Sequence, residues 1–385
     1  MEAAKFAAML SDKNIIDLKK LGYQYHEDLN EFVDLLKKNV YQTLPLPDFN
    51  GENLVYLDSV TRVRLSAARL LLAPRGEGAF GLKAMEEEIA SSLTIENIDF
   101  NRDSVRKILN GYAPQDESEA RIYGMKKGLD FISNPENKIT EENIHKLYHL
   151  AIESYLAQED QLPPESCHWN DAAYIVGQEV EHTGLPHQKL PEYMEKLTAF
   201  IAQDSEMDDL LKAVVIHFYV AYLHPYFDGN GRMARMMHLW YLVQRGFSSA
   251  LFIPLSEYVE RSKKRYYHAY TLCERNASIS GVMDVTAFLV YFIEEVYHKM
   301  KASLPAAQTI DRFRIALDEG KITEKETALW NFVCSAYGDQ EFTTKQLEKD
   351  FGNAAYATIR SFVLKFEGLG LLKARKLGNK VKYRV

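Results

Sequence analysis

The sequence predicts an all-α fold with small β-hairpins, and three observations support that prediction. Aliphatic and aromatic residues recur at three- and four-residue spacing through most of the chain, which is typical of helices with one buried face. The segment Ala172–Leu190 combines small and β-branched residues with a turn-rich stretch. The last fifteen residues alternate between apolar and basic side chains around a Gly-Asn pair. We therefore expect mostly helices, with two short hairpins.

The clearest helical patterns lie in the middle of the chain. Proline and glycine cluster at Leu44–Gly51, at Leu72–Gly81 and around Gly111–Pro114, where we expect loops between helices. The segments with helical periodicity are Ile144–Leu156, Leu190–Ala202, Leu210–Leu223, Arg232–Gln244 and Met283–Met300.

A short hairpin is expected between the first two of these helices. Ala172–Val180 is mostly small and β-branched, which favours a strand. His182–Gln188 contains Gly184 and Pro186 and favours a turn-rich linker.

The last 65 residues change in pattern. Ile322–Ala336 and Ala354–Glu367 have helical periodicity, and Thr343 with Gln346 has the spacing of a capping box at the start of a short helix. The alternation that follows predicts two strands that turn at Gly378-Asn379.

The same region is basic in an otherwise acidic chain. From residue 345 to residue 385 there are ten Lys and Arg against three Asp and Glu. Helices followed by a basic two-stranded hairpin resemble a winged-helix domain, which would give the chain a DNA or protein partner. The basic residues expected on one face of the hairpin are Lys373, Arg375, Lys380, Lys382 and Arg384.

Composition excludes several classes of protein. The chain has 385 residues, 46% of them hydrophobic and 26% charged, with a net charge of -8. This length accommodates two or three domains with their own cores, and the acidic balance argues against a protein that coats nucleic acid. No apolar run approaches the ~18 residues of a membrane span, and the N-terminus lacks the features of a signal peptide. The three scattered cysteines fit a reducing cytoplasm and no zinc site.

The most informative segment is HPYFDGNGRMAR, residues 224–235, which follows the apolar helix Leu210–Leu223. Proline disfavours helical geometry in the residue before it, so His224 should lie where that helix ends. Gly229-Asn230-Gly231 should form a tight turn, since glycine tolerates positive φ. The helical periodicity resumes at Arg232, so the turn should lead into the N-terminus of a new helix.

These residue types fit the chemistry of phosphate groups. Free N–H groups and the dipole at a helix N-terminus bind anions, and Arg232 and Arg235 lie about one turn apart. Asp228 beside bound phosphates is a natural Mg²⁺ ligand, and His224 can accept a proton near pH 7. Together they indicate phosphoryl or nucleotidyl transfer from a bound triphosphate. The alternative is an ordinary glycine-rich helix start with Asp228 as its cap and His224 in the core.

The segment is similar to the signature HPFx(D/E)GNGRxxR of the Fic domain family, and it departs from it only at Tyr226. The resemblance covers roughly residues 115–300. It implies transfer of AMP from ATP, with Mg²⁺, to a Ser, Thr or Tyr hydroxyl of a target protein. Under this resemblance His224 is the general base and Asp228 the metal ligand. The nucleotide-binding residues are then Phe227, Asp228, Gly229, Asn230, Gly231, Arg232 and Arg235.

A second element resembles the inhibitory pattern (S/T)xxxE(G/N) of this family. Ser92 and Glu96-Asn97 match it in a segment N-terminal to the signature. The resemblance implies that Glu96 pairs with Arg235, occupies the position of the γ-phosphate, and prevents a productive pose of ATP. The alternative is a solvated acid at a helix end.

The resemblance also implies two peripheral sets of residues. A hairpin flap with Tyr174, Ile175 and Val176 would hold the target segment by strand pairing. Tyr266 and Tyr267 lie near where the family contacts adenine, although an aromatic pair on a helix is equally often ordinary core.

The sequence predicts three domains and is compatible with three functions. The N-terminal helical region is expected over residues 1–114, the Fic domain over 115–300 and the winged-helix-like domain over 301–385. The first function is an AMP transferase autoinhibited by Glu96. The alternatives are a hydrolase that removes AMP at the same site and a DNA-binding regulator with a nucleotide-sensing Fic region. A cytoplasmic protein that does not enter the membrane is expected, and the resemblance allows a homodimer.

Overall fold

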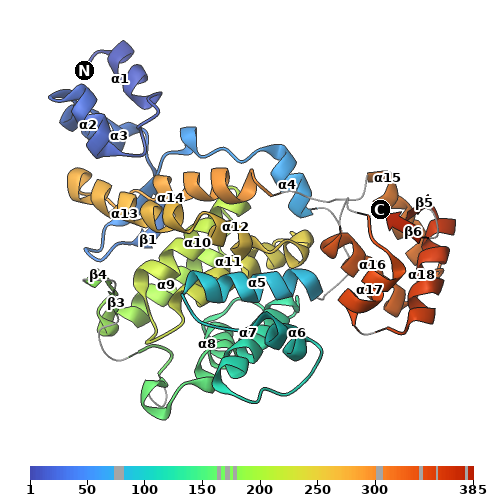
Figure 1. Ribbon diagram of the computed structural model, residues 1–385. Helices are drawn as coiled ribbons and strands as arrows, with labels where there is room; N and C mark the ends of the chain where they lie inside the picture. Colours follow the sequence, from blue (N-terminus) through green and yellow to red (C-terminus); the bar gives the residue numbers. More distant parts are fainter. Residues whose placement is uncertain are drawn as a thin grey trace.

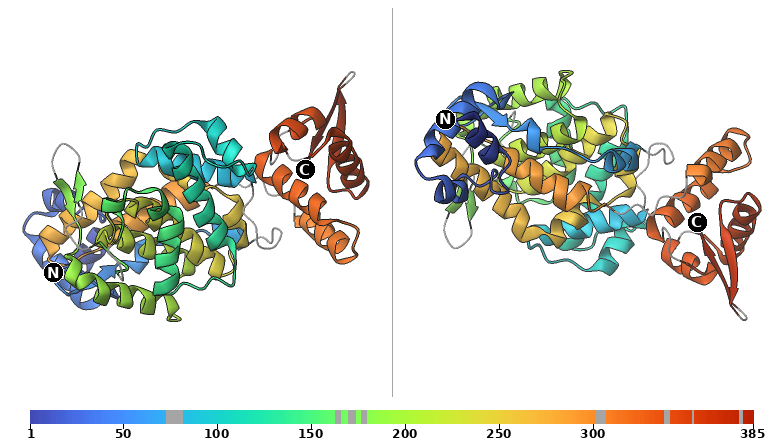
Figure 2. Two further views of the ribbon diagram at one scale, coloured as in Figure 1. Left: turned by 90° about the horizontal axis from the view of Figure 1, so that it is seen from below. Right: turned by 90° about the horizontal axis from the view of Figure 1, so that it is seen from above.

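A computed structural model describes residues 1–72, 82–162, 166–169, 174–176, 180–300, 307–337, 341–352, 354–377 and 380–385. The predicted all-α fold is confirmed, since helices dominate the described residues and the strands form three small antiparallel pairs. Figure 1 shows a large helical body with a small N-terminal module on one side and a C-terminal domain on the other. Figure 2 shows the two chain ends at opposite ends of the molecule.

The N-terminal module packs around its own apolar cluster, in which Met9, Leu21, Phe32 and Leu36 are fully buried. The amide of Leu18 donates to Asn276 Oδ1 at 3.1 Å, which anchors the module on the body. The helices of the module are α1 Ala3–Leu10, α2 Leu18–Tyr25 and α3 Asp28–Asn39.

A hairpin follows this module, so the loop predicted at Leu44–Gly51 is wrong for Leu44–Pro47, which lie in a strand, while Asp48–Gly51 do form a turn. Strand β1, Gln42–Pro47, pairs with β2, Asn53–Tyr56. Leu44 and Leu46 alternate into the core, and this burial outweighs the turn preference of the neighbouring prolines. Prolines are tolerated in such a short edge pairing because few ladder bonds are needed.

The body has one apolar cluster that runs from Leu44 to Met300, across the expected domain boundary at residue 114. Helices α10 and α11 form its centre, and α5 lies across them in Figure 1. The α-helices of the body are α4 Leu65–Leu72, α5 Leu82–Ile95, α6 Arg102–Leu109, α7 Glu117–Ser133, α8 Glu141–Ala151, α9 Leu190–Ala202, α10 Asp209–Leu223, α11 Asn230–Gln244, α12 Leu255–Arg261, α13 Lys263–Ser280 and α14 Thr286–Tyr291. Short 3₁₀ turns are η1 Asp58–Val60, η2 Glu153–Tyr155, η3 Gln158–Asp160, η4 His187–Lys189 and η5 Ser248–Phe252, and η6 Phe292–Tyr297 is a π-helix.

Most predicted helices are present, with shifted ends. The helix predicted over Ile144–Leu156 is α8, which ends at Ala151 and continues as the turn η2. The helix predicted over Met283–Met300 begins only at Thr286, as α14, and changes to the π-helix η6 after Tyr291. The loop at Gly111–Pro114 is confirmed, whereas residues 73–81 of the loop expected after Leu72 lie outside the described residues.

The C-terminal domain has a separate apolar cluster that includes Leu329, Phe342, Leu347 and Phe366. Helix α16 lies against α5 of the body. The elements of the C-terminal domain are α15 Ala307–Asp318, α16 Glu324–Ala336, α17 Thr344–Phe351, α18 Tyr356–Gly368, β5 Lys373–Leu377 and β6 Lys380–Arg384.

Local sequence explains the ends of these helices. Thr343 Oγ1 accepts from the amide of Gln346 at 3.2 Å, as the sequence predicted. A reciprocal capping box that the sequence analysis missed joins Thr323 and Glu326 at the start of α16. The expected helices and hairpin are thus present, while the assignment to the winged-helix class stays a prediction and the turn at 378–379 lies outside the described residues.

No helix within the described ranges combines the length and the apolar character needed to cross a membrane.

Candidate active site

The loop between α10 and α11 is closed by its own hydrogen bonds. Asn230 accepts from the amide of Tyr226 at 3.0 Å and donates to the Tyr226 carbonyl at 2.6 Å. The Tyr226 ring stacks on Tyr148 with centroids 3.9 Å apart, which fixes the loop on α8. Gly229 has a φ of 84°, and an added Cβ would lie 2.8 Å from Ile152, so only glycine fits there. The loop is therefore a rigid support for the residues on either side of it.

His224 caps the C-terminus of α10 in the left-handed conformation, with φ 53° and ψ 57°. This is the helix exit that the sequence predicted, since Pro225 disfavours a helical His224. Its Nδ1 lies 3.3 Å from the carbonyl of Ala221. A carbonyl can only accept, so Nδ1 is the donor in this contact, and in the neutral ring the lone pair is on Nε2. In this tautomer Nε2 is a proton acceptor.

The predicted flap lies beside His224. Strands β3, Tyr174–Val176, and β4, Val180–Thr183, form an antiparallel pair. The chain before β3 donates from the amide of Trp169 to the Pro225 carbonyl at 2.9 Å, and the chain after β4 donates from Leu185 to Leu223 at 2.9 Å. Both ends of the hairpin are thus tied to the His-Pro segment. For Tyr174, Ile175 and Val176 the structure describes the backbone and not the side chains.

The N-terminal turn of α11 holds Arg232 in the interior. This side chain is 1% exposed and donates to Asp228 Oδ2 at 2.7 Å, and it also donates to the Tyr155 hydroxyl. Burial disfavours the charge, but Tyr155 and Asp228 outweigh it and raise the pKa of Arg232 above its ordinary value. Asp228 Oδ1 accepts from the amide of Gly229 at 2.6 Å, and the carboxylate is 44% exposed. Asp228 therefore has a fixed position and an open side.

Arg235 joins α11 to α5, so the segments around Arg235 and Glu96 lie in contact. Its Nε donates to Ser92 Oγ at 2.9 Å, and its Nη2 donates to the Ser92 carbonyl at 3.1 Å and to Glu96 Oε1 at 2.7 Å. The side chain is 4% exposed. Burial disfavours its charge, yet the neighbouring Glu96 and Tyr266 raise the pKa of Arg235 above its ordinary value. Arg235 is therefore a buried cation held by a carboxylate.

The Glu96 carboxylate lies on the first turn of α11. A Cβ added at Gly231 would lie 2.3 Å from Glu96 Oε1 and 3.3 Å from Arg235 Nη1. The carboxylate thus lies beside the first turn of α11, at the end of a helix that attracts anions.

The end of α5 keeps Glu96 in place. The helix ends at Ile95, and Asn97 adopts a φ of 56°, which lets the amide of Ile98 donate to Leu93 at 3.0 Å. Lys263 caps the helix by donating to the Thr94 carbonyl at 3.1 Å and to Asn97 Oδ1 at 2.6 Å. Nothing near Lys263 in the sequence indicates this contact with α5.

The two predicted adenine contacts have different environments. Tyr266 is 3% exposed and bonds to His217 Nε2 at 2.8 Å, within the core. Tyr267 is 40% exposed and donates to the carbonyl of Ile95 at 3.2 Å, next to Glu96. Phe227 is 48% exposed and lies against Trp169, with centroids 5.1 Å apart. The nucleotide contacts of Tyr266, Tyr267 and Phe227 stay predictions. Of the three, Tyr267 has the position that best fits a nucleotide contact.

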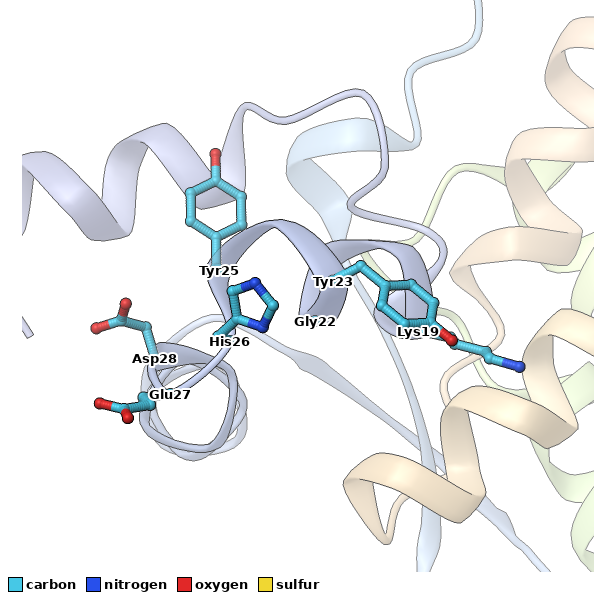
Figure 3. A pocket seen from close by; sticks show the side chains of 7 residues that line it. All are labelled: Lys19, Gly22, Tyr23, Tyr25, His26, Glu27 and Asp28. Atoms are coloured by element: carbon cyan, nitrogen blue, oxygen red, sulfur yellow. The ribbon is translucent and has the colours of Figure 1, made fainter.

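A wide hollow lies elsewhere, on the N-terminal module. Its side chains point away from one another, as Figure 3 shows for Tyr25, His26 and Asp28. These described side chains form no catalytic arrangement. The hollow is lined by Lys19, Gly22, Tyr23, Tyr25, His26, Glu27 and Asp28.

Comparison with known proteins identifies this region. Residues 138–242, which include the whole loop and α11, match the model of the Fic/DOC family. A Fic family protein from Desulfovibrio desulfuricans is 17% identical, with 79% of this chain and 86% of that chain covered and a TM-score of 0.47. A Fic domain containing signaling protein from Bacteroides thetaiotaomicron is 15% identical, with 62% and 89% covered and a TM-score of 0.45. Fic-1 from C. elegans is 17% identical, with 67% and 71% covered and a TM-score of 0.43.

Proposed function

Because residues 138–242 form a Fic/DOC family domain, and such domains generally transfer a nucleotide onto proteins, we propose that this chain transfers AMP from ATP to a hydroxyl side chain of a target protein. One observation carries the proposal. The Nε2 acceptor of His224 and the anion-binding start of α11 lie at the two ends of one rigid loop.

His224, the start of α11 and its two arginines each have a role in this reaction. His224 Nε2 removes the proton from the target hydroxyl, whose oxygen attacks the α-phosphorus of ATP. A phosphodiester forms, the bond to the β-phosphate breaks, and pyrophosphate leaves. The N–H groups at the start of α11 and the buried Arg232 and Arg235 stabilise the negative charge of the phosphates.

Asp228 fits the Mg²⁺ that accompanies ATP. Mg²⁺ commonly takes one or two carboxylates together with phosphate oxygens, and Asp228 offers an exposed carboxylate fixed by Gly229 and Arg232. The metal would neutralise phosphate charge. Among the described residues no group of three His, Cys, Asp or Glu side chains is placed to hold a metal.

The proposal includes inhibition by Glu96. Its carboxylate binds Arg235 and covers Gly231, so the γ-phosphate of ATP competes with it for the same cation. A hydrogen bond to a charged group contributes roughly 1.5–3 kcal/mol, which is comparable to one phosphate contact. Removal of Glu96 should therefore raise the activity.

Labelled ATP tests the proposal. Wild type, Glu96→Gly and His224→Ala are each incubated with a cell lysate, and the label on proteins is measured. We expect Glu96→Gly to label faster than wild type and His224→Ala to lose labelling while it still binds ATP. Equal labelling by all three proteins would disprove the proposed mechanism.

The reverse reaction is the second candidate, since Glu96 lies beside the phosphate site and could orient a water molecule. Purified protein is incubated with a pre-modified target, and free AMP is measured. Slower AMP release by Glu96→Gly than by wild type would assign the hydrolase to this site.

A DNA partner is proposed for the C-terminal domain. Lys373 lies opposite Arg384, and Arg375 lies opposite Lys382, on one face of the β5–β6 hairpin. Glu341 pairs with Arg375 and Lys382 at 3.4 and 3.3 Å, so part of this basic face is already neutralised. A gel shift of the full chain with duplex DNA at low salt tests this partner.

A further inference from the structure

Two side chains of α13 hold the C-terminal end of α5. Lys263 Nζ donates to the Thr94 carbonyl at 3.1 Å and to Asn97 Oδ1 at 2.6 Å. The Tyr267 hydroxyl donates to the carbonyl of Ile95 at 3.2 Å. Lys263 and Tyr267 are four residues apart, so they lie on the same face of α13. The last carbonyls of a helix have no partner within it, and here a second helix supplies partners for two of them.

The electrostatics of this helix end explain why a cation is needed there. The C-terminus is the negative end of the helix dipole, which favours a cation and disfavours a carboxylate. Glu96 follows directly after the last residue of α5, and the last turn of α5 contains no basic residue. Lys263 therefore supplies, from another helix, the positive charge that this end lacks. Without that charge the Glu96 carboxylate would lie at the least favourable end of its own helix.

The lysine at position 263 brings no benefit to α13 itself. Lys263, Lys264 and Arg265 are the first three residues of α13, and its first turn contains no acidic residue. The N-terminus is the positive end of the helix dipole, where cations are disfavoured. Local stability of α13 thus does not account for a lysine at this position, whereas its contacts with α5 do.

We propose that Lys263 and Tyr267 form a latch, the α5 latch, that holds the end of α5 and sets how strongly Glu96 inhibits the site. The inference rests on the proposed function, and it makes Lys263 a positioning residue that acts on the reaction only through Glu96. With the latch closed, Glu96 Oε1 stays 2.7 Å from Arg235 Nη2. When Lys263 loses its charge, the helix end opens more often, and the carboxylate leaves Arg235 to a phosphate.

Lys263 is better suited to a test than Tyr267, because Tyr267 is also a predicted nucleotide contact. Lys263→Met keeps an unbranched side chain and removes the charge and the donors. The matched control is Lys264→Met in the same turn of α13. Lys264 is exposed and points about 100° away around the helix.

The hold on α5 is tested without any nucleotide, by hydrogen exchange of the full chain. The amides of Asn97 and Ile98 donate to the carbonyls of Thr94 and Leu93 at 3.1 and 3.0 Å, so they are protected only while the end of α5 is formed. They should exchange about three- to tenfold faster in Lys263→Met than in Lys264→Met, because a charged hydrogen bond is lost. Equal exchange in the two variants would overturn the latch.

The effect on inhibition is tested by self-labelling with labelled ATP. In an otherwise wild-type chain, Lys263→Met should label itself about three- to tenfold faster than Lys264→Met. In the Glu96→Gly background the two variants should label equally, because no carboxylate is left to release. General damage to the fold would lower labelling in both backgrounds, so an acceleration that requires Glu96 identifies the positioning role.

The outcomes separate this inference from the proposed function. An acceleration by Lys263→Met of the same size in both backgrounds would show that Lys263 does not act through Glu96, and would overturn the inference. So would equal labelling by Lys263→Met and Lys264→Met when Glu96→Gly labels faster than wild type. A Glu96→Gly protein that labels no faster than wild type would instead refute the proposed inhibition, and hydrogen exchange would still decide whether Lys263 holds α5.

Discussion

Gly231 and Glu96 should be energetically coupled, although they lie on different helices. A Cβ at position 231 would lie 2.3 Å from Glu96 Oε1, which is closer than non-bonded atoms approach. In Gly231→Ala the carboxylate must therefore move off the first turn of α11 and away from Arg235. In the Glu96→Gly background the same methyl group has no carboxylate to displace.

The magnitude follows from two opposing effects. Gly231 is within α11 and has no positive φ, so alanine should stabilise the helix by roughly 0.4–1 kcal/mol. Displacement of Glu96 costs a charged hydrogen bond of roughly 1.5–3 kcal/mol, which we reduce to about 1–2 kcal/mol because the carboxylate is 29% exposed. We therefore expect Gly231→Ala to stabilise the Glu96→Gly protein and to destabilise the wild type or leave it unchanged. The coupling energy should be about 1–2 kcal/mol.

The assay is a double-mutant cycle on the free energy of unfolding. Wild type, both single variants and the double variant are compared by urea unfolding and by hydrogen exchange of the α11 amides, which reports on the body rather than on the C-terminal domain. The matched control is Gly368→Ala at the end of α18, where an added Cβ meets nothing within 4 Å. Its effect should not depend on residue 96. Effects of Gly231→Ala that are equal in both backgrounds, within about 0.5 kcal/mol, would refute the contact.

Three further predictions concern catalysis, inhibition and pH, and a fourth concerns the hairpin. His224→Ala should lower the transfer rate by ~10²–10⁴-fold while ATP affinity, measured by titration, is retained. Glu96→Asp should label itself at a rate between those of wild type and Glu96→Gly, because the shorter side chain reaches Arg235 less well. Burial, reinforced by His145, lowers the pKa of His168 from 6.5 to about 4. The unfolded chain takes up this proton first, so the free energy of unfolding should fall as pH drops from 6.5 to about 4. His168→Asn should reduce that slope by up to about 1.4 kcal/mol per pH unit. Duplex binding, measured by gel shift, should weaken steeply with salt and should weaken further when the basic residues of one hairpin face are replaced, namely Lys373, Arg375, Lys380, Lys382 and Arg384.

The site was predictable where its chemistry is encoded in short segments. The helix exit at His224 follows from local backbone preferences, and the structure has it. Of the turn predicted over Gly229–Gly231, only Gly229 has a positive φ, because Asn230 and Gly231 already belong to the first turn of α11. The meeting of Glu96 with Arg235 came from a resemblance between two motifs, because nothing in either segment specifies the other. The contacts of Lys263 arise only when α13 lies against the end of α5, and no local pattern reports such packing.

The difference between local preferences and long-range packing also explains the errors in the predicted fold. The β1–β2 hairpin was missed because prolines in the sequence favour a loop, whereas burial of Leu44 and Leu46 decides the structure. The late start of α14 has a similar cause. The amide of Val285 donates to the Val55 carbonyl at 2.9 Å, so the residues before Thr286 pair with β2 instead of starting the helix.

The ion pair between Glu96 and Arg235 joins two segments of a single chain, so its strength does not depend on protein concentration. A tethered carboxylate acts as a competitor whose effective concentration is set by chain geometry, and this concentration reaches the millimolar range for flexible tethers. Dilution of the protein leaves that competition unchanged, whereas a competitor supplied by a second molecule would dissociate. For the proposed ATP site, the balance between the carboxylate and the γ-phosphate would therefore be set by the level of ATP and by the stability of the α5 terminus.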